Sequence, residues 1–388
     1  MPLSNRSLRC GWLWLLFFVA TTPQARVLIN EIHYRPANES VDEEFIELWN
    51  FEGEPVALDG WQLDAGVRFV FSKITLPPDS GLVVAANAAR FAELHPGIEN
   101  VTGNWQGQLA NNGEAIRLID ATGATADKVR YATEGDWAQR IRGPLHGGHR
   151  GWIWHAAHDG DGHSLELMQP GLSNSQAQNW HASLAKGGTP GRVNSAKIAN
   201  MPPFILDVIH SPAVPRSTDP VTVTASVIDE SSDRISAQLV YRLDGDADYQ
   251  ELPMARSDAE QFAATLPAQA DGQVIEFFVN ATDGQGAVRA WPSAPADCPV
   301  LLYQVDDQIV TPGRPVHRLI LTRRERDELT EIGRRPWHNN SDAQMSGTFI
   351  NIEGGRTRVH YNVGVRLRGT TSRAATYKSR RINFPNDR

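Results

Sequence analysis

Residues 26–50 read RVLINEIHYRPANESVDEEFIELWN, and two stretches within them decide the fold. In VLINEI (27–32) and EFIELWN (44–50), β-branched and aromatic residues recur with a period close to two, as in half-buried strands. The connection between them contains Pro, Asn and Ser, which are typical turn residues. The segment therefore predicts two neighbouring β-strands.

The same kind of pattern continues up to about residue 131. Further strands are expected at 60–63, 68–71, 82–86, 115–120 and 129–131, with a short helix over 87–94. Short strands at this spacing, joined by Gly, Pro and Asn, predict a β-sandwich. We assign residues 26–196 to this first domain.

These strands also carry motifs of a known family. The matching pieces are LINEIHYRP (28–36), EEFIELWN (43–50), LDGWQL (58–63), LANNGEAIRLID (109–120), GDGHSLELMQPG (160–171), NWHAS (179–183) and GGTPGRVNS (187–195). In their order they resemble the lamin-tail domain. The resemblance implies an immunoglobulin-like sandwich that serves attachment or binding in exported bacterial proteins.

Two further regions follow the Met201-Pro202-Pro203 join. Residues 202–298 contain strand-like runs at 204–209, 221–227, 237–242, 262–266 and 274–281, separated by Asp-Gly turns. This region resembles the immunoglobulin-like or fibronectin type III spacers of exported proteins. Residues 299–388 predict strands at 316–321, 349–352, 356–361, 363–369 and 379–384. A helix is expected from Arg323 to about Arg335, opened by a capping box of Thr322 and Glu325. The overall fold class is mainly β, with an incomplete α+β region at the end.

Charge divides the 388 residues unevenly. The chain carries a net charge of −8, and 16 Lys and Arg against 9 Asp and Glu give residues 299–388 a balance of +7. Residues 1–298 therefore carry −15. An acidic body of this kind argues against nucleic acid as a partner.

The N-terminus has the pattern of an export signal. Arg6 and Arg9 precede an apolar run from Cys10 to Ala20 that is short for a membrane span, and cleavage is expected after Ala25. An uncleaved membrane anchor is the alternative. Cleavage would leave Cys298 as the only cysteine, so the mature chain would have no intrachain disulfide. No later stretch approaches the roughly 20 apolar residues of a membrane helix, so no transmembrane helix is expected after cleavage.

The segment from 135 to 181 offers two candidate sites. His155, His158, Asp159 and Asp161 are residue types that bind zinc or calcium, although their spacing fits no complete motif of either metal. A solvated loop is the alternative. Trp152 and Trp154 share strand parity and are candidates for contact with a carbohydrate. For the seven Trp residues of this domain, core packing is the alternative.

The C-terminal motif suggests a second kind of function. YNVGVRLRGTTSR (361–373) and YKSRRINF (377–384) resemble the opening of CotH-type proteins, an atypical protein-kinase family. The resemblance implies that Lys378, supported by Arg368, contacts nucleotide phosphates of ATP. It also implies that the carboxylates holding magnesium lie beyond Arg388, so that the sequence is a fragment or a truncated product. A basic sheet with solvated charges is the alternative.

We expect an exported surface or extracellular protein that binds or scaffolds and is not catalytic as given. Its ligand would be a protein or a carbohydrate. The alternative is the N-terminal part of a secreted CotH-like kinase that uses ATP and magnesium. A metallohydrolase built on His155, His158 and Asp161 is the third hypothesis.

Overall fold

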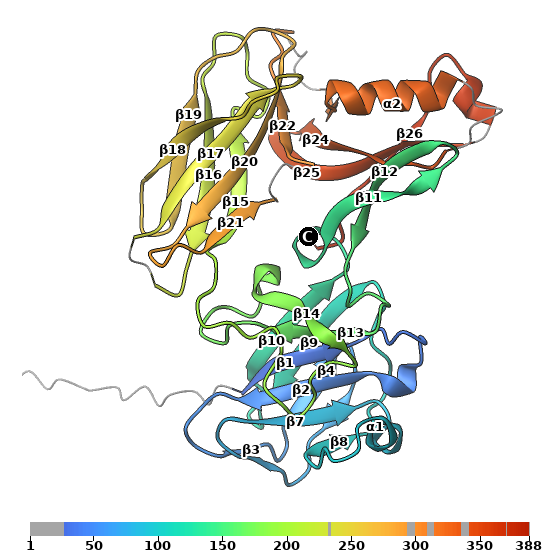
Figure 1. Ribbon diagram of the computed structural model, residues 1–388, viewed down its shortest axis with the longest axis vertical. Helices are drawn as coiled ribbons and strands as arrows, with labels where there is room; N and C mark the ends of the chain where they lie inside the picture. The colour runs from blue at the N-terminus through green and yellow to red at the C-terminus, as the bar shows by residue number, and fades with distance from the viewer. Residues whose placement is uncertain are drawn as a thin grey trace, which may run out of the picture.

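The computed structural model describes residues 27–231, 234–292, 299–308, 314–334, 341–369 and 371–387. They form three β-rich units, which we name the N-terminal sandwich (27–196), the middle sandwich (202–308) and the C-terminal unit (314–387) (Figure 1). The predicted fold class, mainly β with immunoglobulin-like sandwich sheets, is confirmed. The predicted leader at 1–25 and Cys298 lie outside the described residues. Within the described ranges, no helix is long and apolar enough to cross a membrane.

The N-terminal sandwich packs a six-stranded sheet, in the order β14-β13-β1-β2-β7-β8, against a four-stranded sheet, in the order β10-β9-β4-β5. The six strands are β14 Trp180–Lys186, β13 His163–Leu167, β1 Val27–His33, β2 Phe45–Asn50, β7 Ser80–Ala85 and β8 Val101–Gly103. The other four are β10 Thr125–Ala132, β9 Gly113–Ile119, β4 Gln62–Ala65 and β5 Phe69–Val70, and a small ribbon pairs β3 Val56–Ala57 with β6 Thr75–Leu76. The predicted short helix is α1, Ala88–Leu94, and its N-cap Asn87 accepts a hydrogen bond from the Arg90 amide.

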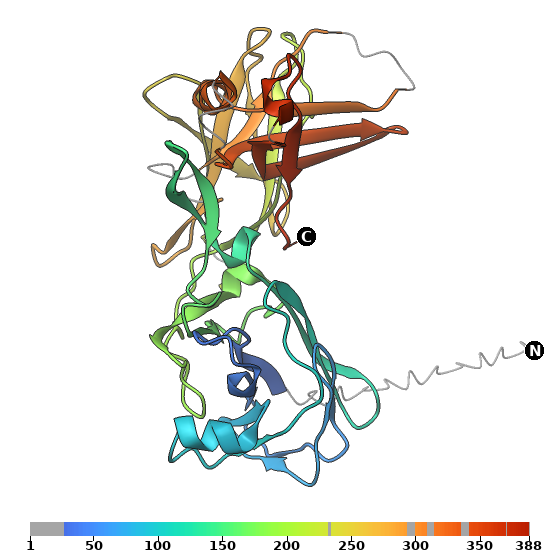
Figure 2. The same ribbon diagram turned by 90° about the vertical axis from the view of Figure 1, so that its right-hand side faces the viewer.

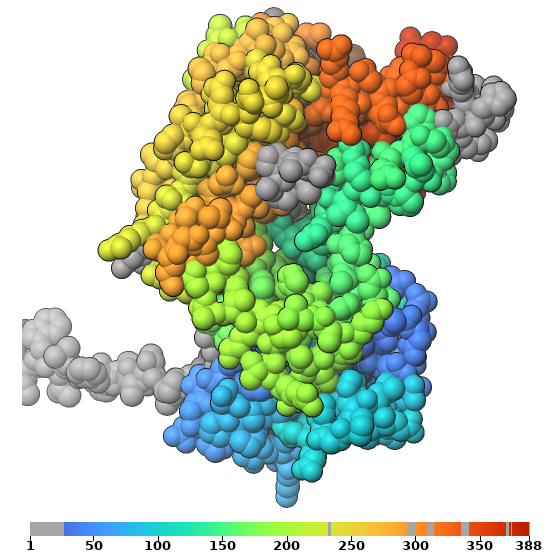
Figure 3. Space-filling model, viewed as in Figure 1, coloured from blue at the N-terminus to red at the C-terminus, as the bar shows by residue number. Residues whose placement is uncertain are grey.

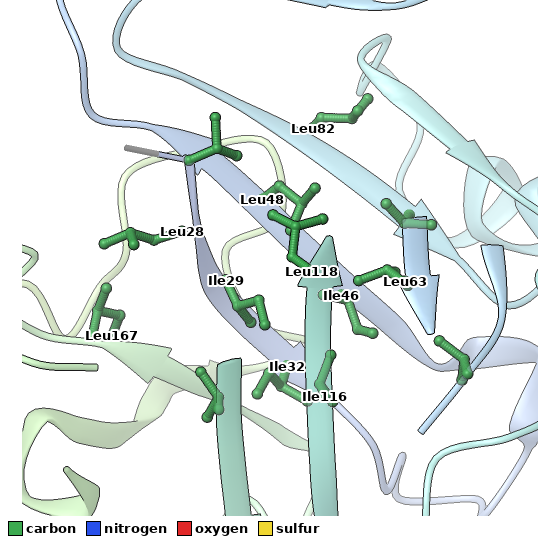
Figure 4. Close-up of a cluster of buried hydrophobic side chains, with 14 of the residues drawn as sticks. Leu28, Ile29, Ile32, Ile46, Leu48, Leu63, Leu82, Ile116, Leu118 and Leu167 are labelled. Atoms are coloured by element: carbon green, nitrogen blue, oxygen red, sulfur yellow. The ribbon is translucent and has the colours of Figure 1, made fainter. Parts of the chain in front are cut away.

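The core of this sandwich lies between its two sheets. Ile29 and Ile32 of β1 and Ile46 of β2 face Ile116 and Leu118 of β9, and each of these side chains is completely buried (Figure 4). Burial of apolar area on this scale stabilises the sandwich by roughly 25 cal/mol for each Å² removed from water. The first two predicted strands therefore form the centre of the larger sheet.

The outer face of the same sheet is also covered, which the alternating pattern does not predict. Glu31, Glu47 and Glu166 lie side by side across β1, β2 and β13, and all three are completely buried. They hold the loop 187–196: the amide of Thr189 donates to Glu31, that of Gly191 to Glu47 and that of Ala196 to Glu166. Gly188 has a φ of +75°, and a Cβ there would lie 1.9 Å from a Glu31 oxygen. The GGTPGRVNS motif is therefore a cover for three buried carboxylates.

The middle sandwich is built from eight strands in the order β15-β16-β19-β18-β17-β20-β21, with β22 beside β21 on the free edge of β20. The strands are β15 Phe204–Ser211, β16 Val221–Ile228, β17 Ser236–Leu243, β18 Gln250–Arg256, β19 Gln261–Leu266, β20 Val274–Thr282, β21 Val288–Trp291 and β22 Leu301–Gln304. Because β22 pairs with β20, residues 301–304 lie in this sandwich, beyond the boundary at 298 that we predicted from the sequence.

The C-terminal unit is a four-stranded antiparallel sheet with one helix. Its elements are β23 Val316–Ile320, α2 Arg323–Arg334, β24 Met345–Glu353, β25 Arg356–Leu367 and β26 Arg380–Asn383. The runs predicted as separate strands at 356–361 and 363–369 form a single strand, β25, in which Asn362 adopts a φ of +53° next to an irregularity in register. The apolar side chains of α2 pack on this sheet around Leu329 and Ile332.

One hairpin leaves the N-terminal sandwich and reaches the C-terminal unit. It consists of β11 Gln139–His146 and β12 His149–His155, and it extends alongside β24 and α2 (Figures 1 and 2). The last described residues, 384–387, return to the base of this hairpin, where Asn386 donates an amide hydrogen bond to Glu134. The three units therefore meet at one junction.

Candidate binding site at the junction of the three units

The hairpin presents two arginine–tryptophan pairs on one face. In its register Arg140 lies opposite Trp154 and Arg142 opposite Trp152. The Arg140 guanidinium lies 4.7 Å from the centroid of the Trp154 ring, and that of Arg142 lies 3.8 Å from the centroid of Trp152. Cation–π contacts of this kind stabilise a partly desolvated pair by about 0.5–2 kcal/mol.

Trp152 attaches the hairpin to the C-terminal unit. Its backbone amide donates to the Gln344 carbonyl at 2.7 Å, and its indole Nε1 donates to Glu325 Oε1 of α2 at 3.0 Å. The other oxygen of Glu325 accepts from the Ser346 amide at 3.0 Å. Half of the predicted capping box is present, because the Thr322 hydroxyl accepts a hydrogen bond from the Glu325 amide. The Glu325 carboxylate is instead directed to the hairpin and to β24.

The tip of the hairpin makes a second set of contacts. His149 Nδ1 lies 2.7 Å from Glu328 Oε1, and the Asp342 amide donates to His146 Nδ1 at 3.0 Å. Gly151 permits the close approach, because a Cβ at this position would lie 2.3 Å from the backbone nitrogen of Gln344. The docking therefore depends on backbone contact as well as on side chains.

A cavity of about 550 Å³ lies beside the hairpin, enclosed by residues of all three units. Arg140 and Trp154 contribute from the hairpin, Arg289 and Trp291 from the middle sandwich, and Tyr361 and Phe384 from the C-terminal unit. In the space-filling view the surface is hollowed between the hairpin and the middle sandwich (Figure 3). The volume lies within the range of about 300–1,000 Å³ that small-ligand sites occupy.

Asp136 is the polar centre of the cavity wall. Its carboxylate accepts from Trp291 Nε1 at 2.8 Å and from Gln178 Nε2 at 3.1 Å, so residues of two units share one acceptor. Gln178 also exchanges hydrogen bonds with the backbone of Ile205 at the start of the middle sandwich, at 2.8 and 3.0 Å. These contacts fix the first two units relative to each other.

The arginines of the wall are strongly desolvated. Burial lowers the pKa of the Arg140 guanidinium to about 10, although the carboxylates of Glu134 and Glu325 act in the opposite direction. Burial likewise lowers the pKa of Arg289, against the effect of Asp136. The Arg289 guanidinium donates to the backbone carbonyls of Pro203 at 2.8 Å and of Pro202 and Gln178 at 3.3 Å, so it is part of the contact between the first two units.

Tyr361 connects the cavity to the middle sandwich. Its hydroxyl lies 2.5 Å from Nδ1 of His210, whose Nε2 is 3.0 Å from the Ala213 carbonyl. His210 is completely buried and stacks on Tyr303, and desolvation lowers its pKa to about 4. The imidazole is therefore neutral at pH 7 and belongs to the interface between the last two units.

The residues predicted to bind metal have other roles. Both ring nitrogens of His158 have partners, at 2.8 Å from the Tyr34 hydroxyl and 2.9 Å from the Trp137 carbonyl, and Asp159 pairs with Arg35 at 2.8 Å. Across the described ranges, no three His, Cys, Asp or Glu side chains converge as a metal site. His155, His158, Asp159 and Asp161 are thus not gathered into one, and binding of zinc or calcium stays a prediction.

The tryptophans separate into two groups. Of the seven tryptophans in the N-terminal sandwich and its hairpin, Trp154 alone is half-buried. The other six are buried, as core packing predicts: Trp49, Trp61, Trp105, Trp137, Trp152 and Trp180. Trp152 and Trp154 do share one face of the hairpin, but Trp152 is covered by Arg142 and bonded to Glu325. Of these two tryptophans, only Trp154 lines the cavity.

Sequence reasoning missed Arg140, Arg289 and the C-terminal wall. QRIRG (139–143) and GWIWH (151–155) each alternate with period two, and placing them opposite each other would have paired arginine with tryptophan. Arg289, Tyr361 and Phe384 come from distant segments and carry no local signal.

The residues of the C-terminal motif lie mainly in structural positions. Lys378 Nζ donates to the carbonyls of Arg373 and Ala375, at 2.9 and 3.3 Å, and its aliphatic stem lies against Gly333 of α2. Arg373 is buried and donates to Ser341 and Leu367 carbonyls. Arg368 is exposed.

Comparison with known families assigns two segments of the chain. Residues 20–133 match the family model of the Lamin Tail Domain. Residues 207–291 match that of the alpha-1,4-glucan:maltose-1-phosphate maltosyltransferase, domain N/S. No curated protein matches the chain.

The first match confirms the lamin-tail resemblance for the segment it covers. It ends before the hairpin, whereas β13 and β14 lie beyond residue 133 and still pair into the lamin-tail sheet. The hairpin is thus inserted between strands of one sandwich. Both matches end before the C-terminal unit, so the CotH resemblance stays a prediction.

Proposed function

We propose that this protein is an exported, extracellular or surface-attached binding protein, and that the junction cavity is its ligand site. The observation that carries the proposal is the cavity wall itself, in which aromatic rings and buried guanidinium groups from three units surround about 550 Å³. A set of aromatic faces with a few fixed polar groups is the usual composition of a small-ligand site.

The ligand class that we propose is carbohydrate. Aromatic faces pack against sugar rings, and the half-buried Trp154 supplies such a face at the wall. The family matched by the middle sandwich includes an enzyme named for its action on an alpha-1,4-glucan, which adds maltooligosaccharides to the set of ligands to test. Export would bring the protein into contact with extracellular glycans.

The test is a fluorescence titration of the full chain with a panel of soluble polysaccharides and oligosaccharides. We expect at least one to bind, and Trp154→Ala to weaken that binding at least tenfold. Ile153→Ala is the matched control, because Ile153 is the adjacent residue on the opposite face of β12 and is 40% exposed. An equal loss of affinity in both variants, or an unchanged affinity in Trp154→Ala, would exclude the cavity as the site.

A second proposal is the kinase function implied by the CotH resemblance. It is supported by the pairing of its two motif strands, since β25 and β26 lie side by side with Arg366 opposite Arg381. Lys378 would have to exchange its two carbonyl partners for phosphate oxygens. ATP binding that is lost in Lys378→Ala and kept in Arg380→Ala would support this function. Absence of ATP binding to a chain extended past Arg388 would exclude it.

A further inference from the structure

The charged groups of the junction cavity balance one another. Arg140 and Arg289 line it together with Asp136 and Asp387, two positive and two negative side chains. The Arg289 guanidinium donates to three backbone carbonyls, and the Asp136 carboxylate accepts two hydrogen bonds from the wall itself. The Asp387 carboxylate accepts from the Asp136 amide at 3.0 Å. A neutral ligand therefore suits this wall better than a charged one.

One neutral polar residue of the wall, Asn362, has an unused hydrogen-bonding group. The residue lines the cavity and is 9% exposed, and its amide oxygen is buried with no hydrogen-bond partner within the described residues. A buried acceptor without a donor destabilises the protein, because the oxygen has lost its water and gained nothing in return. A ligand that donates to this oxygen would remove that penalty on binding.

The backbone at Asn362 is also unusual. Its φ of +53° lies in the left-handed region, at the point where Thr348 of β24 lies opposite two residues of β25, Tyr361 and Asn362. This irregularity is a β-bulge, a feature that re-aims side chains and is common beside binding sites. Glycine would adopt the same φ without strain, so the asparagine is favoured here for its side chain and not for its backbone.

The strand directs this side chain toward the hairpin. Asn362 and Gly364 have the same parity on β25, and alternate residues of a strand share one face. A Cβ at Gly364 would lie 3.4 Å from Arg140 Nη2 of the hairpin, which identifies the side that this face meets. The terminal torsion of an asparagine side chain has a broad preference, so a modest turn of the amide brings its oxygen or its nitrogen to a ligand.

A carboxamide matches two neighbouring hydroxyl groups. Its oxygen accepts from one hydroxyl while its NH2 group donates to the other. A pyranose ring carries such pairs of hydroxyls along its edge and presents a flat face to an aromatic ring such as Trp154, which lines the same cavity. A neutral sugar therefore satisfies both the amide and the ring.

We propose that Asn362 selects the ligand of the junction cavity by binding two adjacent hydroxyl groups of a neutral sugar. This inference rests on the proposed carbohydrate-binding function. It adds the residue that determines specificity and the charge of the ligand.

The test is calorimetric titration of the full chain with three neutral tetrasaccharides: maltotetraose, cellotetraose and mannotetraose. We expect one to bind, with an affinity that added salt leaves unchanged. Asn362→Gly should weaken this binding about tenfold. It should not lower the melting temperature, because glycine adopts a positive φ freely.

The matched control is Asn351→Ala. The amide oxygen of Asn351 is also buried without a partner within the described residues, in the same unit, but this residue lines a separate hollow near the tip of the β24–β25 hairpin. The control should bind the tetrasaccharide as the wild type does. An equal loss of affinity in the two variants would overturn the inference.

Modified ligands distinguish a direct contact from a structural effect. Deoxy forms of the binding tetrasaccharide each lack one hydroxyl group. We expect one of them to bind the wild type about tenfold more weakly than the parent sugar does, and to bind Asn362→Gly as the parent does. A loss that is the same in both proteins for every deoxy form would show that Asn362 does not contact the ligand.

The outcomes separate this inference from the proposed function. A tetrasaccharide whose binding depends on Trp154 and is unchanged in Asn362→Gly would overturn the role of Asn362 and leave carbohydrate binding standing. Binding of tetragalacturonate with no binding of the three neutral probes would overturn the neutral ligand. Absence of binding to every glycan tested would overturn both the inference and the proposed function.

Discussion

At the residue scale, the buried carboxylates make the stability of the N-terminal sandwich depend on pH. Burial raises the pKa of Glu47 to about 7, and burial together with the neighbouring Glu47 raises that of Glu31 well above its usual range. A carboxyl whose pKa is raised by folding binds its proton more tightly in the folded state. Its contribution is therefore greatest below the unfolded pKa, near 4.5, and decreases as pH rises to about 7.

We predict that Glu47→Gln becomes relatively more stable as pH rises. At pH 5 the buried Glu47 is protonated and resembles glutamine, whereas at pH 8 the wild type must bury a charge. The difference in free energy of unfolding between variant and wild type should shift by roughly 2–3 kcal/mol in favour of the variant from pH 5 to pH 8. Urea unfolding followed by tryptophan fluorescence measures it.

The matched control is Glu54→Gln, at an exposed position of the same sandwich. Its difference from the wild type should stay the same at both pH values. A Glu47→Gln variant that shows no shift would mean that Glu47 ionises normally in the folded protein.

At the scale of elements, the hairpin is the feature that joins the sandwich to the C-terminal unit. The indole of Trp152 and the carboxylate of Glu325 form a buried hydrogen bond to a charged acceptor. Such bonds contribute about 1.5–3 kcal/mol, more than neutral ones do. The hairpin should therefore lose much of its attachment when either partner is changed.

We predict a coupling free energy of about 1–2 kcal/mol between Trp152→Phe and Glu325→Gln in a double-mutant cycle. The measurement is the free energy of opening of β12, from hydrogen exchange in the wild type, both single variants and the double variant. Asp327→Asn, on the exposed side of α2, replaces Glu325→Gln in the control cycle and should give no coupling with Trp152→Phe. Additive effects in the first cycle would contradict the role of this bond.

Most strands could be predicted from the sequence, because their apolar side chains face one core. Ile29 and Ile46, for example, lie in strands predicted from the alternation of VLINEI and EFIELWN. The burial of Glu31 and Glu47 could not be predicted in the same way. Their cover is a loop about 150 residues further along the chain, and alternation reports only which side of a strand is polar.

The candidate site was predictable only in part. Parity placed Trp152 and Trp154 on one face, but which of them stays accessible depends on Glu325, which comes from another unit. The predicted capping box is formed only in part for the same reason. Thr322 accepts from the Glu325 amide, but the Glu325 carboxylate accepts from the Ser346 amide of β24. A site assembled from three units carries no contiguous motif, so its residues become visible only in the folded protein.

At the scale of the whole molecule, His210 links the stability of the assembly to pH. Its pKa falls from 6.5 to about 4 on burial, so only the unfolded state takes up its proton between these values. The contribution of His210 to stability is therefore greatest above pH 6.5 and decreases by roughly 2–3 kcal/mol as pH falls toward 4.

We predict that the stability advantage of the wild type over His210→Gln shrinks as pH falls from 7 to 4. The glutamine does not titrate, so the variant lacks this contribution. Hydrogen exchange of peptides that cover β20, corrected for the intrinsic rate at each pH, measures it. An advantage that is the same at both pH values would show that His210 titrates normally.

The central claim is that the ligand site exists only when the three units are assembled. The direct test is Gly151→Val, which places side-chain atoms against the Gln344 backbone and should detach the hairpin without changing either core. With circular dichroism showing that the units remain folded, we predict that this variant binds the wild-type glycan at least tenfold more weakly. Unchanged affinity would contradict the claim and would place the ligand on a single unit.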